Sequence, residues 1–150
     1  MRVLNPLRTL AVGLLALLTA GCSESRHVRI TGDLDRPTVS VLRTDAGGAV
    51  RACVDWIAVF DSARGNGLDG AVWRVRSADG RCVDLESITY GRTPDGFVVD
   101  TPPQTLRADV IYEAGGHGWT GGFASVPWYG AGRYIFTDGA WQPATRSSRP

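Results

Sequence analysis

The chain has 150 residues, 43% of them hydrophobic, and its 16 basic and 15 acidic residues give a formal net charge of +1 at pH 7. A chain of this length suits a single domain that can bury a sizeable core. The balanced charge, with no basic cluster, argues against a nucleic-acid partner.

The first 21 residues have the pattern of a secretory signal peptide. Arg2 and Arg8 give a basic start, and an uncharged apolar run follows over residues 10–20. A basic start, a short apolar stretch and small residues before the cleavage point are typical of an export signal. The run is too short for a transmembrane helix, which needs about 20 apolar residues. We therefore expect residues 1–21 to be removed on export.

The end of this signal, LTAGC at residues 18–22, resembles the lipobox of bacterial lipoproteins. In that family the cysteine, here Cys22, receives a diacylglyceryl group and becomes the first residue of the mature chain. Thr19 is the one departure, because leucine is commonest at that place. The resemblance covers the N-terminal sixth of the chain and implies an envelope protein held on the membrane by acyl chains such as palmitate. An ordinary signal peptide with a chance cysteine is the alternative.

The residues after the cysteine bear on where the domain lies. Ser23, rather than aspartate, follows Cys22, and the sorting rules of the family then favour the outer membrane, facing the periplasm, in a Gram-negative cell. One acyl chain binds a membrane only marginally, whereas two or three hold a protein there. Residues 22–26 are predicted to be a short lipidated tether, so the domain expected over residues 27–142 lies close to the bilayer.

Three strands are predicted in the first part of the domain, at residues 27–31, 38–43 and 50–60, and a loop follows over residues 61–70. Period-two alternation divides the third strand between two faces. One face is expected to carry Ala52, Val54, Trp56, Ala58 and Phe60, and the other Arg51, Cys53 and Asp55.

Residues 71–77 and 81–86 predict a β-hairpin. A three-residue loop between them places Gly80 in the left-handed conformation that glycine adopts readily. This register matches apolar residues and opposite charges across the two strands. The expected pairs are Val75–Val83, Trp73–Leu85, Arg74–Asp84 and Arg76–Cys82.

Cys53 and Cys82 remain as a pair once Cys22 carries lipid. In an oxidising compartment two such cysteines are expected to form a disulfide. Both lie on the polar faces of their predicted strands, which agrees with a bond on one side of a sheet. His27 and His117 are too remote in sequence to complete a metal site with them, and no metal or cofactor is expected.

The rest of the chain is also predicted to be strands and turns. Turn signals recur about every ten residues and no segment of the domain has a helical period, which indicates an all-β domain. We expect an antiparallel sandwich or small barrel of seven to nine strands with one disulfide. Residues 115–122 are predicted as a glycine-rich loop and residues 143–150 as a frayed tail. The further strands are predicted at 87–90, 97–100, 106–113, 119–125, 133–137 and 140–142.

Aromatic residues gather near the C-terminus, where seven of the chain's 13 lie between positions 119 and 141. Trp119, Trp128 and Tyr129 fall in a part without regular alternation, so both a core role and a surface role stay open for them. Exposed tryptophan and tyrosine make binding hot spots or sugar-stacking platforms. His117 lies between glycines beside them, and we include it in the candidate partner- or sugar-binding site.

The favoured function is a membrane-anchored, non-catalytic periplasmic lipoprotein that binds a macromolecular partner. An inhibitor or immunity protein against a cell-wall hydrolase or toxin fits this description, and the known lysozyme-inhibitor lipoproteins are similar in architecture alone. The first alternative is a peptidoglycan- or polysaccharide-binding module that uses the aromatic, glycine-rich segment. The second is a small envelope hydrolase with a catalytic His117, although no serine lies in a G-x-S-x-G motif.

The lipid anchor leads to a first testable prediction. Cys22→Ser removes the thiol that accepts the diacylglyceryl group, so the exported variant should pass from the membrane fraction to the soluble fraction and take up no labelled palmitate. Fractionation of cells that express either protein measures this. Cys22→Ser protein that still fractionates with membranes after export would show that the lipid-anchor hypothesis is wrong.

Overall fold

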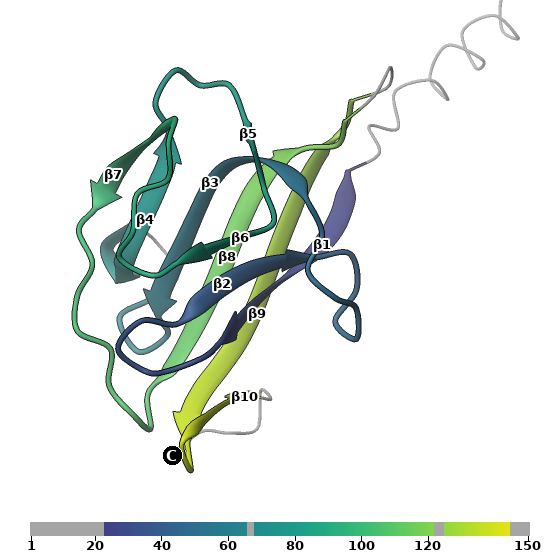
Figure 1. Ribbon diagram of the computed structural model, residues 1–150. Coiled ribbons are helices and arrows are strands. Elements are labelled where there is room, and N and C mark those ends of the chain that lie inside the picture. Colours follow the sequence, from purple (N-terminus) through teal and green to yellow (C-terminus); the bar gives the residue numbers. More distant parts are fainter. Residues whose placement is uncertain (1–22, 66–67, 122–124, 145–150) are drawn as a thin grey trace, which may run out of the picture.

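The computed structural model describes residues 23–65, 68–121 and 125–144, whose path is drawn in Figure 1. The expected signal peptide, Cys22 and most of the expected tail lie outside the described residues. The described chain forms ten strands and one short 3-10 helix, η2 (Leu68–Gly70). The strands are β1 (Glu24–Thr31), β2 (Thr38–Leu42), β3 (Ala52–Asp61), β4 (Ala71–Ser77), β5 (Val83–Leu85), β6 (Ser87–Thr89), β7 (Phe97–Thr101), β8 (Ile111–Trp119), β9 (Pro127–Thr137) and β10 (Ala140–Pro143).

All ten strands belong to one curled sheet. Its order is β6-β2-β1-β9-β8-β3-β4-β7, with β5 beside β3 and β10 beside β9. The sheet curls into a half-barrel, so β2 and β6 lie across from β3 and β8 (Figure 1). The predicted all-β class is confirmed. The strands are ten rather than seven to nine, and the sheet is mixed because β1 pairs with β9 in parallel, which turn signals between neighbouring strands do not predict.

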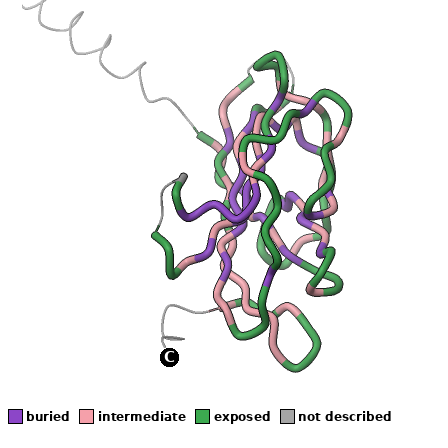
Figure 2. Tube along the Cα trace, turned by 90° about the vertical axis from the view of Figure 1, so that its left-hand side faces the viewer, coloured by how far each residue is buried: buried purple, intermediate pink, exposed green. Residues whose placement is uncertain are grey.

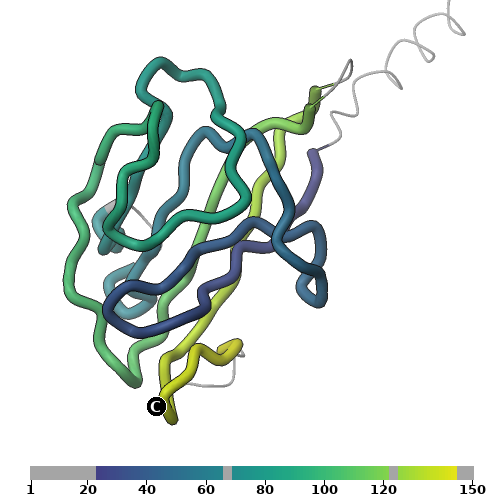
Figure 3. Tube along the Cα trace, in the orientation of Figure 1, coloured from purple at the N-terminus to yellow at the C-terminus, as the bar shows by residue number. Residues whose placement is uncertain are grey.

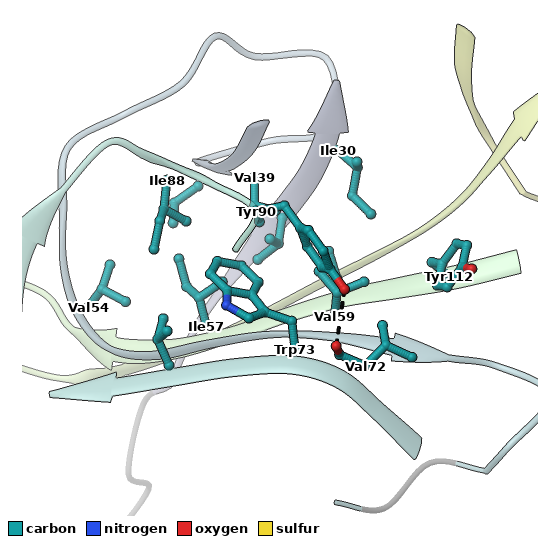
Figure 4. Close-up of a cluster of buried hydrophobic side chains, with 14 of the residues drawn as sticks. Ile30, Val39, Val54, Ile57, Val59, Val72, Trp73, Ile88, Tyr90 and Tyr112 are labelled. Carbon is teal, nitrogen blue, oxygen red and sulfur yellow. Dashed lines mark hydrogen bonds between the residues drawn. The ribbon is translucent and has the colours of Figure 1, made fainter. Parts of the chain in front are cut away.

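The core fills the concave face of the half-barrel. Side chains from β1, β2 and β6 point toward side chains from β3, β4 and β8 (Figure 4). Trp73, Trp128 and Tyr112 are the largest of the fully buried side chains. In Figure 2 the buried residues follow the central strands, whereas the turns at both ends are mostly exposed. Each buried valine or isoleucine of this cluster contributes about 1.5–3 kcal/mol relative to an exposed one.

Tyr90 connects the β6 end of the curled sheet to β4, near its other end, by hydrogen bonds and ring packing. It follows β6, and its hydroxyl lies 3.0 Å from the carbonyl oxygen of Val72 on β4 and 2.7 Å from that of Gln104. Its ring packs on Trp73, with the centroids 5.1 Å apart. Burial raises the pKa of the Tyr90 hydroxyl to about 12, because the charged phenolate is poorly solvated there. The hydroxyl therefore stays neutral at any physiological pH and shares its single proton between these two carbonyl oxygens.

A β-bulge in β3 reverses which side chains of this strand face the core. Asp55 is an extra residue between Val54 and Trp56, which pair with consecutive residues of β8. A bulge sets two residues of one strand against one of its partner and so changes the alternation beyond it. Val54 and Ile57 are therefore both fully buried, and Trp56 lies on the opposite face. The predicted single apolar face that holds both Val54 and Trp56 is wrong for this reason.

β4 and β5 do not form the predicted hairpin. Both run antiparallel to β3, β4 along its second half and β5 along its first. β5 therefore continues in the direction of β4 after an excursion over residues 78–82. Gly80 does adopt the predicted left-handed conformation, with φ of +75°. The expected pairs across the hairpin, such as Val75 with Val83, are wrong because β3 pairs with both strands.

β8 lies later in the chain than the predicted strand 106–113, and it contains glycines that were expected in a loop. A Cβ atom on Gly118 would lie 1.9 Å from the carbonyl oxygen of Cys53, and one on Gly116 would lie 3.3 Å from the ring of Trp128. These glycines therefore allow close packing in the middle of the sheet rather than turn the chain. The predicted strand over residues 119–125 falls partly outside the described residues.

The predicted disulfide is confirmed. Cys53 of β3 is bonded to Cys82, with the two Cα atoms 5.1 Å apart and a sequence separation of 29. The bond joins β3, beside its bulge, to the excursion that separates β4 from β5. It therefore crosslinks the part of the sheet that departs most from regular pairing.

Removal of this bond should lower the free energy of unfolding by about 3.5 kcal/mol, because the unfolded chain regains the entropy of a loop of roughly 30 residues. The Cys53→Ser/Cys82→Ser double variant should show this loss in urea denaturation followed by circular dichroism. Wild-type protein under reducing conditions should unfold like the variant. Equal urea midpoints for the variant and the oxidised wild type would contradict a stabilising role for the disulfide.

Candidate functional site

The candidate site lies on the outer face of the sheet, opposite the core. We define the outer-face patch as the side chains of Asp55, Trp56, His117, Trp119 and Tyr129. His117 of β8 pairs with Tyr129 of β9 on one side and with Trp56 of β3 on the other. Three adjacent strands, each about 4.8 Å from the next, thus place an aromatic row across the sheet.

His117 is at the centre of this row. Its ring centroid lies 4.6 Å from that of Tyr129, and 6.5 Å from that of Trp56, with an angle of 19° between the planes of Trp56 and His117. Trp119 meets His117 edge-on, with centroids 6.0 Å apart. Offset or edge-on contacts of this kind stabilise aromatic pairs beyond their buried area. The strands and these contacts together hold the rings in a defined arrangement.

Asp55 orients the histidine. Its carboxylate oxygen Oδ2 lies 3.1 Å from Nδ1 of His117. An ionised carboxylate only accepts hydrogen bonds, so Nδ1 carries the proton, and in the neutral ring Nε2 is left as an acceptor. The side chain of His117 is 13% exposed and that of Asp55 is 31% exposed, so a partner at the surface reaches the carboxylate more readily than the ring.

Two arginines border the patch on β4. The guanidinium of Arg74 lies over the ring of Trp56, 5.2 Å from its centroid, as in a cation–π contact. Arg74 and Arg76 both pair with Asp100 of β7, at 3.5 Å and 2.7 Å. This replaces the predicted partners of the two arginines, which were Asp84 and Cys82. One carboxylate between two guanidinium groups leaves this border with net positive charge.

Small residues under the patch allow its rings to lie close to the sheet. A Cβ atom on Gly115 would lie 3.5 Å from Phe60 and 3.6 Å from Trp56. Ala58, which pairs with Gly115, is fully buried although it lies on the outer face. Trp56 and Phe60 therefore cover the sheet here, and the more exposed Tyr129 and Trp119 form the accessible side of the patch.

Trp128 does not join the other predicted site residues. It is 0% exposed and belongs to the core, and its indole Nε1 donates a hydrogen bond of 3.0 Å to the carbonyl oxygen of Cys53. As the neighbour of Tyr129 in a strand, it points to the opposite face of the sheet. Its predicted place in the binding site is therefore corrected to a place in the core.

The structure thus brings His117, Trp119 and Tyr129 together and adds two residues that sequence reasoning missed. Asp55 and Trp56 were assigned to opposite faces of β3, and the bulge brings both to His117. A signal was present in the sequence, since an aspartate next to a tryptophan interrupts an otherwise apolar strand. Phe123, a member of the aromatic cluster, lies outside the described residues.

Neither a metal centre nor a membrane-spanning helix is found in the described part of the chain. It holds no group of three or more histidine, cysteine, aspartate or glutamate side chains that are placed to bind a metal ion. It also contains no helix with the length and apolar character needed to cross a bilayer. Comparison of this chain with protein-family models, with curated proteins and with solved structures gives no match.

The opposite orientations of Trp128 and Tyr129 are testable by substitution. Trp128→Ala should lower the free energy of unfolding by about 3–5 kcal/mol, because it opens a cavity in the core. Tyr129→Ala should change it by only about 0.5 kcal/mol, since its side chain is largely exposed. Urea denaturation of the two variants measures both values. Similar losses for the two variants would contradict this division of the sheet into a core face and a patch face.

Proposed function

We propose that the chain is a lipid-anchored, non-catalytic protein of the bacterial envelope that binds a macromolecular partner through the outer-face patch. One observation carries the proposal. Tyr129 is 57% exposed and Trp119 is 41% exposed. Both contact His117 on the outer face of the sheet, opposite the core. Large aromatic side chains left accessible in a cluster mark interaction sites in soluble domains.

The composition and rigidity of the patch favour a protein partner. Tryptophan, tyrosine and arginine are the residues most enriched in binding hot spots, and the patch holds two tryptophans and a tyrosine beside Arg74 and Arg76. Their rings are already ordered by mutual contacts and by regular strands. Binding then costs little side-chain entropy. An inhibitor or immunity protein, which presents a rigid surface to a cell-wall hydrolase or toxin, is the class that these features support best.

A polysaccharide such as peptidoglycan is the second candidate partner. Trp56 and His117 present nearly parallel rings, and the partly exposed carboxylate of Asp55 is an acceptor for sugar hydroxyl groups beside them. A sugar ring stacks on an aromatic face while its hydroxyl groups bond to such polar neighbours. This arrangement supports the alternative, but the side chain of His117 is only 13% exposed, which leaves little of its ring open to a sugar.

The proposal is tested by removing the most exposed ring of the patch. Tyr129→Ala should lower the affinity for the native protein partner about tenfold or more, because truncation of a hot-spot residue costs about 2 kcal/mol. The partner is first recovered by cross-linked pull-down from the native envelope, and its affinity is then measured with purified proteins. Val99→Ala is the matched control, since Val99 is 44% exposed on β7 outside the patch and should bind like the wild type.

Other outcomes of the same experiment would favour a different function or a different binding surface. Recovery of peptidoglycan without a protein, lost in Tyr129→Ala, would favour the polysaccharide module. Hydrolysis of an envelope substrate that His117→Ala abolishes without loss of stability would favour the hydrolase, in which Asp55 orients a histidine base. A partner that binds wild type, Tyr129→Ala and Val99→Ala equally would place the interaction away from the patch.

A further inference from the structure

The described chain begins directly beside the patch. Ser23 is its first residue, and Glu24 already pairs with Trp128 while Ser25 pairs with Tyr129. The sequence predicts a short lipidated tether over residues 22–26, but β1 takes up three of these five residues. The start of β1 and the joined ends of β8 and β9 lie at the same end of the molecule (Figure 3).

The covalent chain therefore limits how far a lipid on Cys22 can lie from the sheet. Only Ser23 separates Cys22 from Glu24 in the sequence, and two residues of chain reach at most about 8 Å. Glu24 is hydrogen-bonded into the sheet beside the first residues of β9. Acyl chains on Cys22 that enter a bilayer would thus draw this end of the domain onto the headgroups, with no arm to separate the two.

The hairpin end, which we define as Trp119, Thr120, Gly121, Ser125, Val126 and Pro127, has the chemistry of a membrane-contacting surface. None of these six residues is charged. Trp119 is 41% exposed, and tryptophan is enriched at the headgroup level of membranes because its ring is apolar and its N–H is polar.

Three hydrogen bonds lie within the hairpin end. The amide of Thr120 donates to the carbonyl oxygen of Val126 at 2.8 Å, and the amide of Val126 donates to Oγ1 of Thr120 at 2.9 Å. The hydroxyl of Ser125 donates to the carbonyl oxygen of Thr120 at 2.6 Å. Groups that already have partners lose less when water is displaced by lipid.

We propose that the hairpin end rests in the headgroup layer of the membrane, with Trp119 as its interfacial anchor. This inference rests on the proposed lipidation of Cys22. Strands β8 and β9 then rise from the bilayer, and the outer-face patch points sideways, along the membrane surface, because the side chains of a sheet project perpendicular to its strands. Tyr129, His117 and Trp56 would thus meet a partner held at the membrane surface.

The test uses the full lipidated protein, purified in detergent and reconstituted into vesicles of phosphatidylethanolamine and phosphatidylglycerol with brominated acyl chains. Bromine quenches only the tryptophan fluorescence that arises at the bilayer. Wild-type protein should be quenched, and Trp119→Phe should lose most of this quenching. Trp141→Phe is the matched control and should keep it, because Trp141 lies on β10, beside the far end of β9. Equal quenching of wild type and Trp119→Phe would overturn the inference.

The readouts separate this inference from the proposed function. The mass of the N-terminal peptide and co-sedimentation with vesicles show whether Cys22 carries lipid. Lipidated protein whose Trp119 is not quenched overturns the membrane contact alone, whereas an unmodified Cys22 overturns the lipid anchor and the membrane contact together. Unquenched Trp119 whose replacement weakens partner binding as strongly as Tyr129→Ala would show that this patch residue contacts the partner and not the membrane.

Discussion

The bulge at Asp55 is the constraint on which the candidate site depends. One extra residue in β3 sets both Asp55 and Trp56 against His117 of β8. Without it, regular alternation would keep Trp56 on the same face as Val54 and direct it into the core. The disulfide at Cys53 and the hydrogen bond from Trp128 to the carbonyl oxygen of Cys53 hold the strand just before the bulge. Bulges commonly redirect side chains at functional sites, and this one assembles the patch.

Consecutive residues of the central strands β8 and β9 face opposite sides of the sheet, one side packing in the core and the other carrying the outer-face patch. On the concave side, the carbonyl oxygen of Cys53 and the indole of Trp128 leave Gly118 no room for a Cβ atom, while one residue earlier His117 projects to the outer side. Glycine is normally unfavourable in a strand because it loses the most backbone entropy on folding. Here close packing on both faces offsets that cost. The result is a rigid platform whose exposed rings are positioned by the core beneath them.

Sequence reasoning succeeded where the information is local and failed where it depends on distant pairing. The all-β class follows from frequent turns, and the left-handed Gly80 follows from its place in a short turn. The Cys53–Cys82 bond follows from the count of cysteines. The parallel β1–β9 pair, the bulge and the run of β5 along β3 depend on residues far apart in the chain, which no local period reveals. The same limit explains why the aromatic cluster was found but Trp128 could not be separated from Tyr129.

If the outer-face patch is the proposed partner site, a partner covers Tyr129 in intact cells. Site-specific photo-cross-linking measures this contact, with a benzophenone amino acid placed at position 129 or at position 99 of the full-length chain. We expect a single defined adduct from position 129 and none from position 99, which lies on β7 outside the patch. No adduct at position 129, or the same adducts from both positions, would contradict it.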